Sequence, residues 1–255
     1  MEKLSRRKFT GEALASLATF CLLKTAYEGD LFAQAVKPVT DGWLRELHQL
    51  CGDLRVEKVS QIQWQRQVTQ LFARIEMAEL LRFIDFERLE KQVRIPDEGV
   101  AVERVAFPQP GWMPDERGWG MSLFTLDKGR AVMPHGHHNM VSMHLVLKGT
   151  LHVRHYDRVE EGSQHVVMRP SVDRRSSAGG ATTISDDKDN IHWLQNIGDG
   201  KAFTLDVVVS GLDPGLGFQF KQFYVDPLGS ERVRDGLVRA RKIGFEEASK
   251  LYGRS

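Results

Sequence analysis

Residues 129–149 read GRAVMPHGHHNMVSMHLVLKG and contain four histidines within ten positions, namely His135, His137, His138 and His144. Seven of the nine histidines in the chain lie between positions 135 and 165, and His192 follows in a second segment with a strand-like pattern. Neutral imidazole is the commonest protein ligand of first-row transition metals. The stretch joins two strand-like runs, so it indicates a metal site on a β scaffold.

The composition fits a globular protein rather than a disordered or membrane protein, with 41% hydrophobic and 27% charged residues. Residues 36–255 contain 30 Lys and Arg and 30 Asp and Glu. This balance predicts no nucleic-acid partner and no binding to an anionic membrane surface. The two cysteines are Cys21 and Cys51. Cys51 lies in a helical pattern and is expected to be a buried structural thiol.

The first 35 residues resemble a bacterial twin-arginine export signal. Ser5, Arg6, Arg7 and Phe9 precede an apolar run at 13–23. That run is too short to span a bilayer, which needs about 20 residues. Ala33-Gln34-Ala35 offers a cleavage site, and an ordinary amphipathic helix is the alternative. The resemblance implies the twin-arginine export machinery as a partner, no integral membrane span, and a periplasmic or secreted protein.

The pattern changes from helical to β near Pro96. Residues 41–55 and 59–89 carry apolar residues at helical spacing, which predicts two or three helices. Many short β-prone runs follow and favour an all-β sandwich or barrel; they cover 101–107, 118–126, 141–147, 151–156, 165–168, 182–184, 192–195, 203–209 and 218–225.

Three connecting segments have patterns of their own. Residues 148–150 are predicted to be a hairpin turn, residues 171–180 a loop, and residues 230–252 a helix. The chain is therefore divided into an export signal at 1–35, a helical preface at 36–97, a barrel at 98–228 and a C-terminal helix at 229–255. A single domain of this length can bury a full core.

The spacing from Gly129 resembles the first motif of the cupin superfamily, G-x5-H-x-H-x3,4-E-x6-G. Gly129, His135, His137 and Gly149 fall in register with it. Residues two apart on a strand point to the same face, so both histidines can aim into a barrel.

The end of the second cupin motif, H-x3-N, is matched by His192 and Asn196, although the Pro and Gly that normally precede it are absent. The resemblance implies a mainly β fold: a cupin-type double-stranded β-helix, or jelly-roll, barrel with helices before and after it. It also implies that His135, His137 and His192 are metal ligands.

Ser142 stands where the first cupin motif has its glutamate. Three histidines without a carboxylate resemble the thiol dioxygenase branch of the cupins, which oxidises cysteine and aminothiols. That branch binds ferrous iron through three imidazoles and leaves positions open for a thiolate and dioxygen. Residues 189–192 and 222–224 are similar to segments of that branch. The resemblance implies an exported iron(II) dioxygenase whose substrates are a small thiol and O2.

Other residues are candidates for the surroundings of the metal. His144 shares its strand parity with Ser142, so it can be a fourth ligand, an acid–base group, a residue that orients a ligand, or a satisfied core histidine. Tyr224 is a candidate active-site phenol or a core residue with its hydroxyl at the rim. His138 has the opposite parity and is expected at the rim. The remaining histidines, His152, His155 and His165, are expected to be structural or exposed.

Two other functions stay open. One is a cupin isomerase, lyase or different oxygenase that uses manganese, zinc or nickel on a non-thiol small molecule. The other is a periplasmic cupin that binds a ligand without catalysis. Analysis of the bound metal separates the first of these from an iron dioxygenase. The cupin resemblance also implies that the protein can form a homodimer.

Overall fold

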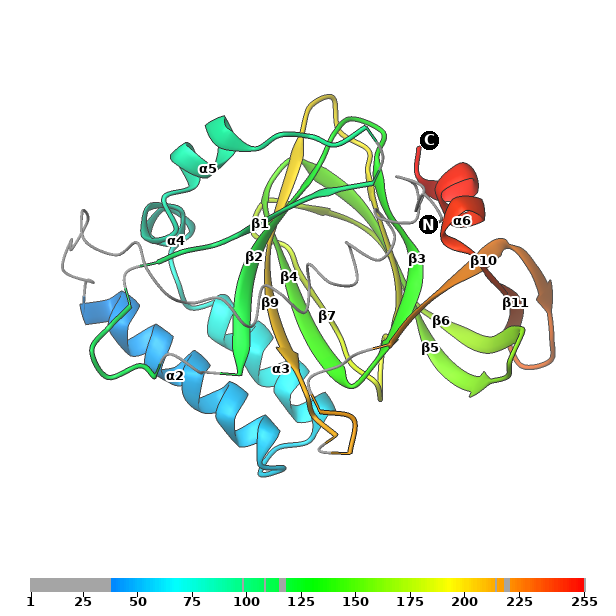
Figure 1. Cartoon of the computed structure of the whole chain (residues 1–255), viewed down its shortest axis with the longest axis horizontal. Helices are drawn as coiled ribbons and strands as arrows, with labels where there is room; N and C mark the ends of the chain where they lie inside the picture. Colours follow the sequence, from blue (N-terminus) through cyan, green and yellow to red (C-terminus); the bar gives the residue numbers. More distant parts are fainter. Residues whose placement is uncertain are drawn as a thin grey trace, which may run out of the picture.

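The described part of the chain begins with helices, continues as two antiparallel sheets and ends in a short helix (Figure 1). The computed structural model describes residues 38–97, 99–107, 109–114, 118–213, 215–217 and 221–254. The predicted export signal at 1–35 lies outside the described residues. Among the residues that are described, no helix combines the length and the apolar character needed to cross a bilayer.

The helical preface contains four helices in its described part, α2 (Pro38–Arg55), α3 (Gln61–Phe72), α4 (Met77–Phe83) and α5 (Phe86–Gln92). The helical run expected over 59–89 is interrupted before α4 and before α5, where Asp85 takes a left-handed φ of 53°. A capping box between Ser60 and Gln63 starts α3 by satisfying backbone N–H groups at its first turn. Cys51 is buried in the same core as Trp64, as predicted, and burial raises the pKa of its thiol to about 12.

The β part has the jelly-roll arrangement. Its strands are β1 (Ala101–Arg104), β2 (Trp119–Leu126), β3 (Ala131–His138), β4 (Met140–Lys148), β5 (Thr150–Glu161), β6 (His165–Ser177), β7 (Ala181–Ile184), β8 (Ile191–Asn196), β9 (Ala202–Ser210), β10 (Lys221–Arg232) and β11 (Val238–Ile243). One sheet has the order β1-β2-β9-β4-β7, and the other closes on itself in the order β10-β11-β6-β5-β8-β3. The chain crosses repeatedly between the sheets, so β2, β9, β4 and β7 oppose β3, β8, β5 and β6 around one interior. The predicted fold class is confirmed.

The two faces of the first sheet have different neighbours. Odd-numbered residues of β4 and β9, such as Met143 and Leu205, share a core with the preface helices, which lie along this sheet in Figure 1. Because successive strand side chains alternate between faces, the even-numbered residues point into the barrel. Val146 follows this rule, since it packs with Leu194 of the opposite sheet.

A β-bulge in β3 decides which way the histidines of that strand point. Val132 pairs with Leu194 and the next pair is His135 with His192, so two residues of β3 lie between these pairs where β8 has one. Val132 packs inside the barrel with Leu194. Regular alternation from Val132 would turn His135 outward, and the extra residue turns it inward. The bulge therefore aims His135 and His137 at the interior.

Two of the predicted connections are wrong. Residues 148–150 form no hairpin, because β4 and β5 lie in different sheets and the chain crosses between sheets at Gly149. Residues 171–177 are strand rather than loop, because β6 continues to Ser177 and pairs with β5 along its length. The polar composition of this segment reflects exposed side chains on a paired backbone.

The predicted C-terminal helix at 229–255 is wrong for most of its length. β10 continues to Arg232, β11 follows, and only α6 (Phe245–Tyr252) is helical. β11 pairs with both β10 and β6 and so closes the second sheet. Val238 and Ala240 pack there against Val166 and Met168. Burial between two partner strands overrides the helical composition of this segment.

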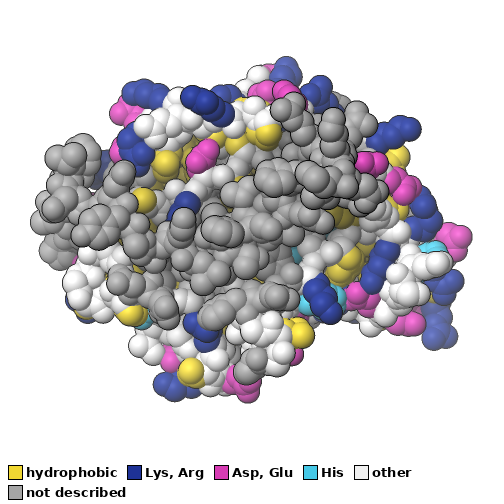
Figure 2. All heavy atoms as spheres, in the orientation of Figure 1, with side chains coloured by type: hydrophobic (Ala, Val, Ile, Leu, Met, Phe, Trp, Pro, Cys, Tyr) yellow, Lys and Arg dark blue, Asp and Glu magenta, His cyan; other side chains and the backbone are white. Residues whose placement is uncertain are grey.

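Acidic and basic side chains are interspersed among the coloured residues of the face shown in Figure 2, in keeping with a formal net charge of +1. Surface ion pairs such as Arg45–Asp41 at 2.8 Å and Lys128–Asp199 at 3.2 Å are solvent-exposed. Solvent screens such exposed pairs, so each contributes little to stability. The stability of the fold therefore comes mainly from its buried apolar core.

Gly149 and Gly179 make a matched pair for testing the crossing between the sheets. Both have a φ of +87°, but a Cβ on Gly149 would lie 2.8 Å from the Cα of Ala202, whereas one on Gly179 would meet nothing within 4 Å. We expect Gly179→Ala to lower the free energy of unfolding by about 1–2 kcal/mol through backbone strain alone. Gly149→Ala should lower it by about 2–5 kcal/mol, since overlap adds to the strain. Urea denaturation measures both, and equal losses would contradict the close approach.

Candidate metal centre

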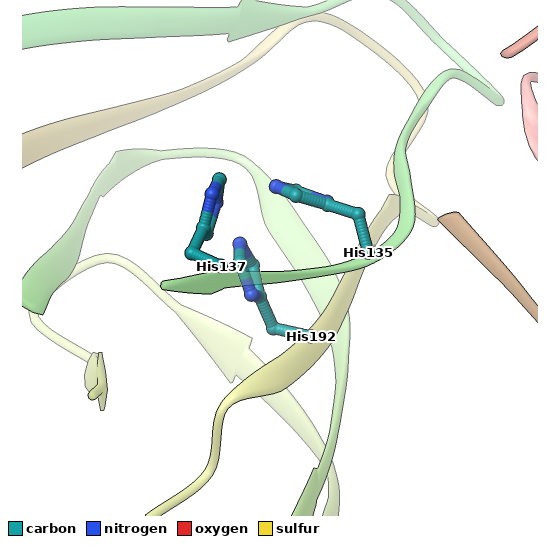
Figure 3. Close-up of side chains that lie close together, drawn as sticks. All are labelled: His135, His137 and His192. Atoms are coloured by element: carbon teal, nitrogen blue, oxygen red, sulfur yellow. The ribbon is translucent and has the colours of Figure 1, made fainter. Parts of the chain in front are cut away.

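Three buried imidazoles meet inside the barrel. His135 and His137 come from β3 and His192 from β8, and Figure 3 shows their rings converging. One ring nitrogen from each lies within 4.8 Å of those of the other two. The sequence prediction had combined these residues from two separate motifs, and the structure brings them together.

Strand pairing positions the three rings. His135 lies opposite His192 in the register of β3 with β8, and their ring centroids are 4.1 Å apart. His137 is two residues further along β3, so it points to the same side, with its ring centroid 4.5 Å from that of His135. A pair from one strand and a third ring from its neighbour thus form a compact donor set.

Backbone carbonyls orient two of the rings. The Nδ1 of His135 lies 2.7 Å from the Met133 carbonyl, and the Nδ1 of His192 lies 3.2 Å from the Asn190 carbonyl. A carbonyl only accepts, so each Nδ1 carries the proton and donates it. In the neutral ring this leaves the Nε2 lone pair available to a metal, the usual arrangement of a metal-binding histidine.

Burial keeps the three imidazoles neutral. It lowers the pKa of His135 to about 4, with a smaller contribution from repulsion by His144. It also holds the pKa values of His137 and His192 well below the usual range, with further lowering by the neighbouring histidines. At neutral pH the rings are therefore unprotonated, as metal ligation requires.

The donor set fits a transition metal. Three imidazoles suit iron, copper, zinc or nickel, while oxygen-rich sites suit magnesium or calcium. Within the described residues, the group that could hold an ion contains no carboxylate. Ser142 occupies the position where a carboxylate is expected, and its side chain is buried on the interior face of β4.

A buried histidine–aspartate pair faces the three imidazoles from the opposite sheet. The Nδ1 of His144 lies 2.6 Å from Oδ2 of Asp206, its cross-strand neighbour on β9. The hydroxyl of Thr204 donates to the other carboxylate oxygen at 2.7 Å. The ring centroid of His144 is 5.6 Å from that of His192. His144 thus lies inside the barrel, as its parity predicted, whereas Asp206 was missed.

A signal for Asp206 was present in the sequence. It is the single charged residue in the apolar run at 202–209, AFTLDVVV. A carboxylate is costly to bury without hydrogen-bond partners. Such a residue in the middle of a buried strand therefore indicates a polar site on the inner face.

His155 was predicted to be structural or exposed, and it is completely buried beside the centre. It lies opposite His192 across β5 and β8, with ring centroids 6.2 Å apart. Its Nε2 lies 3.2 Å from the hydroxyl of Thr182. The alternation of Leu151, Val153 and His155 along β5 would have indicated this inward orientation.

Tyr224 and His138 are the other two candidates. The ring centroid of Tyr224 is 6.0 Å from that of His135, but its hydroxyl accepts a hydrogen bond from Gln222 at 2.7 Å. Burial raises the pKa of Tyr224 to about 12. His138 is partly exposed and contacts Glu161 at 3.0 Å, which agrees with its predicted place at the rim. A role for Tyr224 in catalysis stays a prediction.

One family model and one known protein match part of this chain. A family model described as PCO_ADO matches residues 115–233, which include all three histidines. The mouse (Mus musculus) 2-aminoethanethiol dioxygenase is 27% identical in a match of 160 residues, with 49% of this chain and 61% of that protein covered. The chain therefore spans less than two thirds of the length of that relative.

Solved structures with similar folds include an oxalate oxidase and a cupin superfamily protein. Recombinant oxalate oxidase in complex with glycolate has a TM-score of 0.36 and 22% identity, with 51% of this chain and 56% of that chain covered. A cupin superfamily protein from Desulfitobacterium hafniense has a TM-score of 0.32 and 14% identity, with 48% of this chain and 87% of that chain covered.

The burial of His155 predicts a pH-dependent stability. Desolvation lowers its pKa to about 3, whereas in the unfolded chain the value is about 6.5. Below about pH 6.5 the unfolded state binds a proton that the folded state does not, so stability falls as the pH falls. As the pH falls from 7 to 5, this residue should lower the free energy of unfolding of the metal-free protein by about 2 kcal/mol. Urea denaturation at both pH values should show that His155→Gln loses less unfolding free energy than the wild type. Equal losses in the two proteins would contradict the prediction.

Proposed function

We propose that the protein is a non-haem iron(II) dioxygenase that oxidises a small thiol with O2, and that it belongs to the thiol dioxygenases. The observation that carries the proposal is the buried group of three histidines without a carboxylate. The PCO_ADO match over residues 115–233 supports the same branch. The similarity to 2-aminoethanethiol dioxygenase supports a thiol as the substrate.

The proposed reaction balances without a further reductant. Both atoms of O2 are transferred to the sulfur of R–SH, which becomes the sulfinic acid R–SO2H. Sulfur loses the four electrons that O2 gains, and the thiol proton ends on the product. A bound iron(II) supplies the redox chemistry that allows O2 to react with the thiol.

The residues of the chain prepare the site for this reaction. His135, His137 and His192 would hold the iron, and their low pKa values keep them unprotonated for that task. Beside them, Val146 and Leu194 belong to an apolar cluster inside the barrel. Apolar side chains limit the entry of water and strengthen polar interactions at the site.

We also propose export through the twin-arginine pathway, on the pattern Ser5-Arg6-Arg7-Lys8-Phe9-Thr10. Replacement of both arginines by lysine in the full chain should keep it in the cytoplasm of a bacterial host. Cell fractionation measures the effect, and unchanged periplasmic accumulation would contradict the proposal.

Replacement of one ligand tests the proposed iron dioxygenase. We expect His192→Ala to weaken metal binding by at least about 100-fold, because loss of residues that only support a ligand costs 10- to 100-fold. Metal content after purification, and O2 uptake with cysteine, cysteamine and 3-mercaptopropionate, measure the effect. His138→Ala is the matched control, since this neighbouring histidine lies at the rim and should retain both properties.

Two results would contradict the proposal. One is full metal content and O2 uptake in His192→Ala. The other is a wild-type protein that holds zinc or nickel at full occupancy and shows no iron-dependent O2 uptake with any of the three thiols. The second result would favour the isomerase or lyase alternative.

A further inference from the structure

His144 lies where a substrate bound beside the three histidines would meet it. It projects inward from β4 in the first sheet, and the three histidines project inward from the second. The ring centroid of His144 is 5.6 Å from that of His192. The side chain is 7% exposed, so a ligand that reaches it leaves bulk water.

Asp206 determines which nitrogen of His144 carries the proton. Its Oδ2 lies 2.6 Å from Nδ1 of His144, and its Oδ1 accepts from the Thr204 hydroxyl at 2.7 Å. Both carboxylate oxygens act as acceptors, so Nδ1 of His144 carries a proton and donates it to Asp206. Nε2 then offers a lone pair on the opposite side of the ring.

The Nε2 atom of His144 is buried and has no hydrogen-bond partner among the residues that the structure describes. Nor does His144 belong to the set of nitrogens that lie within 4.8 Å of one another at the centre. Its position and tautomer therefore suit an acceptor for a ligand better than a fourth metal ligand. Ser142, two residues earlier on the same face, also has a buried hydroxyl with no partner among the described residues.

We propose that His144 is a specificity-determining residue whose Nε2 accepts a hydrogen bond from the substrate. This inference rests on the proposed function, because it assumes that a thiol binds at the three-histidine centre. A substrate that carries a hydrogen-bond donor, such as an ammonium group, satisfies the buried lone pair. A substrate that carries a carboxylate in that place leaves the Nε2 lone pair without a donor, and the carboxylate and the lone pair repel each other. The site therefore selects thiols with a donor group.

Asp206→Asn tests the proposal because it keeps the shape and changes the tautomer. The asparagine amide donates to Nδ1 of His144, so the ring proton moves to Nε2 and the acceptor becomes a donor. The probes are cysteamine, which carries an ammonium group, and 3-mercaptopropionate, which carries a carboxylate. Anaerobic calorimetry with iron(II)-loaded protein measures their dissociation constants without turnover.

We expect the wild type to bind cysteamine at least about tenfold more tightly than 3-mercaptopropionate. A difference of this size in the dissociation constant corresponds to one good hydrogen bond. Asp206→Asn should remove or reverse this preference at unchanged iron content. The matched control is Asp173→Asn. Asp173 forms a second histidine–aspartate pair, in which its Oδ1 lies 2.5 Å from Nε2 of His152. This pair lies on the exposed face of β5 and β6. It should retain the wild-type preference.

Nitrogen-15 spectra of zinc-loaded protein give a second readout. The His144 signals, identified by their loss in His144→Leu, should show a proton on Nδ1 in the wild type and on Nε2 in Asp206→Asn. An unchanged preference in Asp206→Asn, or a wild-type proton on Nε2, would overturn the proposal. Because neither measurement requires turnover, a lack of O2 uptake would count against the proposed function alone.

Discussion

The antiparallel pairing of β3 with β8 is the constraint on which the rest of the site depends. It places His135 opposite His192, although the two lie in distant parts of the sequence. The bulge in β3 then turns His135 and His137 toward the interior. A regular strand would present the same residues to the other face of the sheet. One additional residue in one strand therefore decides whether the barrel contains a donor set for a metal.

Packing on both outer faces holds that pairing in place. The preface helices cover the first sheet, with Met143 and Leu205 in their shared core. At the second sheet, α6 packs Ala248 and Tyr252 against Met133 and Trp193, the outward-facing neighbours of the histidines. Close-packed side chains transmit small shifts because interiors have few voids. The helices before and after the barrel thus support the strands that carry the site.

The interior combines an apolar region with a small number of polar groups. Burying a histidine or a carboxylate costs free energy unless hydrogen bonds compensate for it. Asp206 has two such partners, His144 and Thr204. His155 has one in Thr182. Clusters of buried titratable groups are common at binding and catalytic sites.

The sequence by itself determined that helices precede a β barrel and which three histidines form the candidate metal site. Local periodicity, the spacing of His135 and His137 from Gly129, and the spacing of His192 from Asn196 are properties of short segments. Only the tertiary structure decided the inward face of β3, the partner of His144, the burial of His155 and the strand β11. Each depends on register and on contacts between residues far apart in the chain, and a one-residue slip reverses every side chain of a strand. For that reason residues 238–243, which were predicted to be helical, form strand β11, and Asp206 contacts His144 inside the barrel.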